Sequence, residues 1–174
     1  HQVLKETHQT LAPKAAGQAL DYALNIDPHL PQWVRIDPHR FTQILLNLLG
    51  NALKFTVNGG VVTYARFEFN AANHNAGKLI LQVQDTGIGI PAESIDHIFE
   101  PFVQLDTNSN LGNDNSLRGN GLGLAITQSL ITNLGGQITI QSQMNVGSTF
   151  EVHIPIEVAQ EPTVNNHKPV NQTH

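Results

Sequence analysis

The sequence predicts an α+β domain, a fold in which helices and hairpin-paired strands share one hydrophobic core. The chain has 174 residues, 40% of them apolar, which is enough for one domain with a substantial core. Three long segments carry apolar residues at helical spacing, and between them lie segments that alternate apolar and polar residues. Polar turns join two pairs of the alternating segments, which is typical of β-hairpins.

The first third of the chain contains a helix, a strand and a second helix. The first helix is expected over residues 3–17, and an alternating strand over residues 18–26. Asp37 is a suitable N-cap for the second helix, since its side-chain oxygen can accept hydrogen bonds from backbone N–H groups, and Pro38 fits the first helical position. This helix is expected to run to about Thr56.

The remainder contains two hairpins and two further helices. The expected elements are strands at 61–70 and 78–84 around an asparagine-rich turn, a short helix from Pro91 to Phe99, a helix at about 121–134, and strands at 137–142 and 148–154. Residues 103–118 hold little that could be buried, and a loop of this length in a compact domain is usually functional or disordered. Residues 157–174 resemble a polar linker or disordered tail, so the folded domain is expected to span residues 1–156.

The composition excludes several classes of function. A formal net charge of −5 gives no basic footprint for nucleic acid, and no run approaches the ~18 apolar residues of a membrane span, so neither partner is expected. The absence of cysteine excludes disulfides and thiolate metal sites and favours the cytoplasm. The chain begins with His1 and carries no secretory signal, so it is interpreted as a fragment of a longer protein, which could itself be anchored in a membrane.

A narrow polar seam runs along the otherwise apolar second helix. The polar residues that lie within roughly 40° of one line, at 100° per residue, are Arg40, Gln43, Asn47, Asn51 and Lys54. A solvent-facing seam is one interpretation, but such faces are normally filled with strong helix formers, and Asn is a poor one. Asn47 and Asn51 instead place two amide oxygens side by side, and these suit Mg²⁺ that also binds phosphates. Lys54 adds a positive charge for the phosphates.

An acid followed by two glycines ends the apolar strand at 78–84. Asp85 could simply accept backbone hydrogen bonds in a turn. Aspartic proteases also carry Asp-Thr-Gly, but they need two such carboxylates together and this chain has one copy. A carboxylate at a pocket floor would accept a hydrogen bond from an exocyclic amine such as adenine N6 and offer nothing to the carbonyl of guanine. Gly87 and Gly89 would let the backbone approach the base.

Three glycines at alternate positions open the helix at 121–134. Gly119, Gly121 and Gly123 would let backbone N–H groups converge on an anion, and the helix N-terminus adds a partial positive charge. A flexible hinge is the alternative interpretation. The spacing is not the dinucleotide Gly-x-Gly-x-x-Gly, and the chain has no Gly-Lys-Ser/Thr of a P-loop, so phosphate binding here would need another fold.

Together these motifs resemble the ATP-binding catalytic domain of a bacterial sensor histidine kinase, which has the Bergerat-type fold of gyrase, the large heat-shock chaperones and mismatch-repair ATPases. The segments that carry the resemblance occur in the family's order and are Asn47–Thr56 (N box), Asp85–Ile90 (first glycine box), Ile98–Gln104 (F box), Gly119–Leu124 (second glycine box) and Gly147–Phe150 (last glycine motif). The resemblance implies a two-layer α/β sandwich, in which one mixed, mostly antiparallel sheet is covered on one face by about three helices, with a flexible ATP lid.

The resemblance also implies roles for individual residues. Asn51, with Asn47 beside it, would hold Mg²⁺; these two and Lys54 form the expected catalytic set. Asp85 would bind the adenine amine, with Thr149 nearby. The remaining residues expected to contact the nucleotide are Phe55, Gly87, Gly89, Ile90, Arg118, Gly119, Gly121, Leu122, Gly123 and Leu124.

The amide at Asn47 bears on the reaction. Relatives of this fold that hydrolyse ATP have a glutamate there to activate water, and an amide cannot take a proton at neutral pH. The resemblance therefore implies donation of the γ-phosphoryl group to a histidine. No His-Glu-Leu-Arg-like acceptor segment is present, so the expected partners are the histidine-bearing dimerisation domain of the same kinase and a downstream response regulator receiver domain.

Three departures from the family pattern bear on nucleotide affinity and on the lid rather than on the fold, and two alternative functions stay open. Arg118-Gly119-Asn120 stands where Gly-Gly-Thr is usual, Asn145 replaces a common glycine, and the segment between Gln104 and Gly119 is longer than usual. One alternative is a non-catalytic nucleotide-binding module, and the other is a serine kinase of the anti-sigma-factor type on the same fold. The retained Asn51, Asp85 and glycines argue against the first, and the F box argues against the second.

Overall fold

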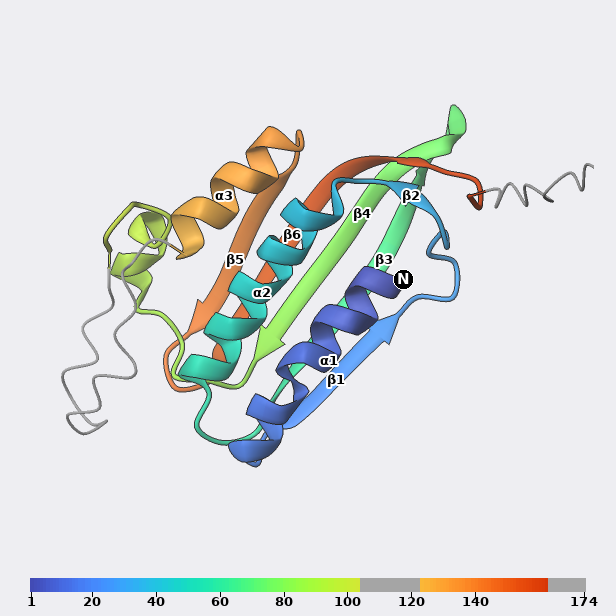
Figure 1. The fold of residues 1–174 in the computed structure, drawn as a ribbon. Helices are drawn as coiled ribbons and strands as arrows, with labels where there is room; N and C mark the ends of the chain where they lie inside the picture. Colours follow the sequence, from blue (N-terminus) through green and yellow to red (C-terminus); the bar gives the residue numbers. More distant parts are fainter. Residues whose placement is uncertain (104–122, 163–174) are drawn as a thin grey trace, which may run out of the picture.

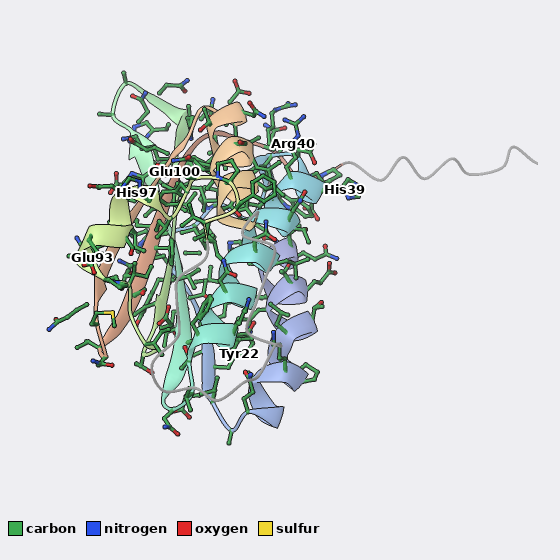
Figure 2. All side chains as sticks on the ribbon, turned by 90° about the vertical axis from the view of Figure 1, so that its left-hand side faces the viewer. Tyr22, His39, Arg40, Glu93, His97 and Glu100 are labelled. Atoms are coloured by element: carbon green, nitrogen blue, oxygen red, sulfur yellow. The ribbon has the colours of Figure 1, made fainter. Side chains whose placement is uncertain are left out.

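The computed structural model describes residues 1–103 and 123–162, which form two layers (Figure 1). Three helices lie side by side on one face of a sheet: α1 (Gln2–Gly17), α2 (Pro38–Phe55) and α3 (Gly123–Asn133), with α2 in the middle. The strands are β1 (Asp21–Ile26), β2 (Val34–Arg35), β3 (Gly60–Asn70), β4 (Asn73–Asp85), β5 (Gln137–Gln143) and β6 (Gly147–Val158). Figure 2 shows the two layers from the side.

The sheet order confirms the predicted mixed, mostly antiparallel sandwich. The strands run β1–β3–β4–β6, and both β2 and β5 pair with β6. Only the β1–β3 pair is parallel among these strands of the described residues; the others are antiparallel. Helices cover one face, so the residues that alternate toward that face form the core with the helices.

Helix α2 is the central element of the core, and its start follows the predicted cap. The Asp37 carboxylate accepts hydrogen bonds from the backbone N–H groups of His39 (2.9 Å) and Arg40 (3.2 Å). Its apolar residues that are at most 1% exposed are Ile44, Leu45, Leu48, Leu49 and Leu53. Leu46, on the same helix, is 36% exposed.

Strand boundaries depart from the prediction where pairing partners are distant in sequence. The asparagine-rich segment expected as a turn is the beginning of β4, because Asn73 pairs with Asn70 and Ala76 pairs with Glu157. Strand β2 was not predicted, since two residues cannot display an alternating pattern. It pairs with the end of β6, which places Glu157 and Val158 in a strand rather than in the tail.

The α1–β1 connection and the segment after Pro91 also differ from the prediction. Strand β1 begins at Asp21 rather than at residue 18, because residues 18–20 close the end of α1: the N–H of Leu20 donates to the carbonyl of Ala15 at 3.0 Å, and Ala19 takes a left-handed φ of 55°. The short helix expected from Pro91 to Phe99 is a 3₁₀ helix, η1 (Ala92–His97). Within the described ranges no helix is long and apolar enough to cross a membrane.

Candidate nucleotide-binding site

Asp85 lies at the end of β4 with a buried carboxyl group, 7% exposed. One of its oxygens, Oδ1, accepts hydrogen bonds from the backbone N–H groups of Gly87 (2.8 Å) and Ser148 (3.3 Å). Burial raises the pKa of Asp85, and these two hydrogen bonds oppose that shift. Because both bonds end on Oδ1, the other oxygen, Oδ2, is the one available to accept from a ligand.

The sheet register places Ser148, not Thr149, beside this carboxyl group. Ser148 is the cross-strand partner of Asp85, so the two side chains share the core face of the sheet. Thr149 pairs with the exposed Gln84, so its side chain lies on the opposite face. The structure therefore places Ser148 rather than Thr149 beside Asp85, and sequence inspection missed Ser148 because Ser148-Thr149 offers two adjacent hydroxyl residues that only the register separates.

The first glycine box is packed between two other backbone segments. The N–H of Ile88 donates to the carbonyl of Phe55 (3.1 Å), and its carbonyl accepts from the N–H of Asn145 (2.8 Å). A Cβ atom on Gly87 would lie 2.5 Å from the carbonyl oxygen of Phe55. Gly89 has a φ of 72°, and a Cβ atom there would overlap the carbonyl of Gln143. These glycines therefore permit close backbone packing around Asp85.

A serine that the sequence analysis did not single out fixes the same region. The Ser142 hydroxyl on β5 accepts from the N–H of Ile90 (2.8 Å), donates to the carbonyl of Gly147 (3.1 Å), and lies 2.8 Å from the Ser148 hydroxyl. The Ile90 side chain is 8% exposed and belongs to the core, and its contact with the nucleotide stays a prediction. Asn145 has a φ of 61°, the left-handed conformation that its position needs.

The polar seam of α2 faces α3 at Asn47. The Asn47 Nδ2 group donates to the Thr127 hydroxyl (3.1 Å) and to the carbonyl of Gly123 (3.4 Å). Asn51 is half-buried one turn further on, and within the described residues its side chain has no hydrogen-bond partner. Two amide oxygens thus lie on one helix face, and neutral oxygens are ligands that fit Mg²⁺. The donor set is therefore compatible with a metal-bound nucleotide.

The end of α2 adds an amine and an aromatic ring. The Lys54 ammonium group lies 5.2 Å from the centroid of the Phe55 ring, and both side chains are half-buried. Burial, and secondarily repulsion from Lys14, lower the pKa of Lys54. Phe55 also binds the glycine box through its carbonyl, as described above.

The F box follows η1 and is partly buried. Ile98 is 5% exposed and Phe99 packs against the core, whereas Phe102 is 74% exposed with a φ of 65°. The Glu100 carboxylate lies 2.8 Å from Nδ1 of His97, and this hydrogen bond raises the pKa of His97 (Figure 2).

Some predicted site residues lie outside the described residues. These are Arg118, Gly119, Gly121 and Leu122, together with the lid at 104–119 and the end of the tail. Of the second glycine box, Gly123 and Leu124 are described: both are half-buried at the start of α3, and Leu124 packs against the core.

The sequence profile of the family described as histidine kinase-, DNA gyrase B- and HSP90-like ATPases matches residues 36–158. The chain therefore belongs to this family, and it is an ATP-binding domain of the histidine kinase type. Curated relatives are the histidine-protein kinase BarA of Escherichia coli (39% identical over 155 residues), the sensor histidine kinase RcsC of Escherichia coli (35% over 161 residues) and the hybrid histidine kinase B of Dictyostelium discoideum (37% over 146 residues).

These alignments cover 89%, 92% and 84% of this chain but only 16%, 16% and 7% of the relatives, so the chain spans a small part of their length. Among solved structures, full-length ShkA in complex with AMPPNP has a TM-score of 0.76 at 31% identity, covering 93% of this chain and 31% of that one. The catalytic domain of the histidine kinase ThkA has a TM-score of 0.64 at 24% identity, covering 88% and 92%, which supports the fold.

Proposed function

We propose that this domain binds Mg²⁺-ATP and donates the γ-phosphoryl group to a histidine on the dimerisation domain of the same kinase, from which a receiver domain of a response regulator takes it. The observation that carries the proposal is the buried Asp85 carboxyl group, with Oδ1 held by two backbone N–H groups and Oδ2 available to a ligand. Such an acceptor matches the amine of adenine and not the carbonyl of guanine.

The α2 seam supports the phosphate end of the proposal. Asn47 and Asn51 would supply oxygen ligands to the metal ion, and Lys54 would add positive charge near the phosphates. When bound, Mg²⁺ would neutralise negative charge that develops on the phosphates during transfer. Gly123 and Leu124 begin α3, whose N-terminal end favours anions.

The amide at position 47 favours transfer over hydrolysis. No carboxylate stands there to take a proton from water, so a bound ATP is held for an incoming nucleophile. A ring nitrogen of the acceptor histidine would attack the γ-phosphorus, the bond from this phosphorus to the β–γ bridging oxygen would break, and ADP would leave. Several curated relatives are hybrid or sensor histidine kinases, which supports an acceptor domain and a receiver as partners.

Asn51→Ala tests the metal assignment. The variant should lose Mg²⁺-dependent ATP binding, while ADP binding without added metal should be affected little because no ion is then present for Asn51 to bind. Isothermal calorimetry of the chain with ATP and ADP, with Mg²⁺ or with EDTA, measures both. Asn133→Ala, which removes an exposed asparagine at the end of α3, is the matched control. Unchanged Mg²⁺-ATP binding by Asn51→Ala would contradict the assignment.

Transfer is tested with radiolabelled ATP. The chain alone should not become labelled, and adding the histidine-bearing domain of the parent kinase should place acid-labile label on that domain. Stable label on one of the chain's own histidines would refute the separation of donor from acceptor. ATP binding without transfer to any acceptor would favour the non-catalytic module, and label on a partner serine would favour the serine kinase.

A further inference from the structure

The junction between α2 and α3 contains a buried hydroxyl group that the proposed function leaves without a role. Thr127 is fully buried, and its hydroxyl donates to the carbonyl of Gly123 at 2.7 Å, one turn earlier in α3. The same hydroxyl oxygen accepts from Nδ2 of Asn47 at 3.1 Å. A helical threonine often bonds the carbonyl four residues back, but here the oxygen also receives a side chain from another helix.

The hydrogen atoms at this junction determine which way the Asn47 amide faces. A threonine hydroxyl has one hydrogen, and the shorter bond to Gly123 uses it. The oxygen can then only accept, so the group facing it must be the NH₂ of Asn47. The reversed amide would bring Oδ1 against the Thr127 oxygen and the Gly123 carbonyl, three acceptors with one hydrogen among them.

We propose that Thr127 is a positioning residue that holds the Asn47 amide with its NH₂ group on α3 and its Oδ1 atom turned toward the nucleotide-bound metal ion. The proposal rests on the proposed function, because it gives Asn47 its metal-ligand role. Partners of metal ligands commonly fix ligand orientation in this way, and their loss reduces metal affinity about 10-fold to 100-fold. The same contact joins the metal-binding helix to Gly123, the last glycine of the second glycine box.

The test compares Thr127→Val, which is close in volume but lacks the hydroxyl, with Thr127→Ser, which keeps it. Thr127→Val should raise the Mg²⁺ concentration that half-saturates ATP binding by about 10-fold. With Thr127→Ser, this Mg²⁺ concentration should lie within about 2-fold of the wild-type value. ADP binding in EDTA should be unchanged in both variants. Thr132→Val, an exposed threonine of the same helix, is the control for the substitution itself.

Two further measurements separate positioning from packing. In an Asn47→Ala background, Thr127→Val should produce no further change in the Mg²⁺ requirement. In the unliganded wild-type chain, side-chain amide NMR should show one Asn47 Nδ2 proton protected from exchange and close to Thr127, a signal that remains decisive if Thr127→Val does not fold.

The outcomes are distinct. If Asn47→Ala raises the Mg²⁺ requirement and Thr127→Val does not, the positioning role is overturned while the proposed function stands. If Asn47→Ala itself leaves the requirement unchanged, Asn47 is not a ligand and both statements about it fall. An Asn47 amide that exchanges freely in the wild-type chain would overturn the positioning role directly.

Discussion

The two ends of the candidate site are built by different means. Around Asp85, most fixed contacts are made by the backbone: N–H groups bind Oδ1, and glycines allow three chain segments to pack closely. At the α2–α3 junction, the fixed contacts are made by side chains, with the Asn47 amide on the Thr127 hydroxyl. The proposed base-binding end therefore depends on backbone conformation, whereas the proposed phosphate-binding end depends on the identity of a few side chains.

The largest effect is expected from Asp85→Asn. The amide oxygen would take over the bonds to Gly87 and Ser148, so NH₂ would face the ligand and oppose the adenine amine. We expect ATP affinity to fall by about 3 kcal/mol, roughly 100-fold. The affinity for inosine triphosphate, which has a carbonyl in place of the amine, should fall less.

Calorimetry with both nucleotides measures this effect, and Asp96→Asn, at an exposed acid of η1, is the matched control. An equal loss for ATP and inosine triphosphate would contradict the donor and acceptor pattern assigned to Asp85.

The next largest effect is expected on stability, from Gly89→Ala, which tests how tightly the backbone around Asp85 is packed. Gly89→Ala would force a Cβ atom onto the Gln143 carbonyl at a φ of 72°, so we expect unfolding to become easier by about 2 kcal/mol. Gly50→Ala is the control, because its Cβ atom would meet nothing within 4 Å and alanine suits a helix, which should stabilise the domain by about 0.5–1 kcal/mol. Chemical denaturation of both variants decides: equal stabilities would mean that the glycine turn is not tightly packed.

The stability of the folded domain should depend on pH because the Asp85 carboxyl group is buried. Its pKa is raised in the folded chain above the ordinary value of 3.8, so the folded state holds this proton at a pH where the unfolded state has lost it. The stability due to this group therefore falls as the pH rises through that window. Asp85→Asn lacks the charge, so it should be more stable than the wild type at pH 7, and the difference should shrink on acidification.

ATP affinity should show the opposite trend, because an exocyclic amine needs the ionised carboxylate as acceptor. It should decrease as the pH falls through the raised pKa of Asp85. Denaturation of both chains over roughly pH 4 to 7 measures the stability trend, and calorimetry measures the affinity. A difference in stability that grows on acidification would contradict the burial argument.

The smallest effect is expected away from both ends of the site. Ala19 takes a left-handed φ of 55° at the end of α1, where glycine is preferred. Ala19→Gly should stabilise the domain by about 0.5–1 kcal/mol and leave nucleotide affinity unchanged. Thermal unfolding with and without ATP tests this, and an altered affinity would show that the α1–β1 connection is coupled to the site.

The sequence predicts those parts of the molecule that depend on local patterns. The apolar periodicity and cap of α2, the Asn47–Asn51 pair and the glycine box after β4 all lie where they were expected. Features that depend on long-range pairing could not be predicted: β2 forms because it pairs with β6, and Ser148 rather than Thr149 lies beside Asp85 because the register with β4 sets which residues share a face. Thr127 and Ser142 escaped notice for the same reason, since their partners are 80 and 52 residues away.

The most direct test of the account is calorimetric titration of the wild-type chain with Mg²⁺-ATP and, separately, with Mg²⁺-GTP. Asp85 Oδ2 can accept from the adenine amine, and it meets only an acceptor in the carbonyl of guanine. Our prediction is saturable binding of ATP and an affinity for GTP at least about 100-fold weaker, as expected where a buried polar group is left unpaired. Equal affinities for the two nucleotides would contradict it.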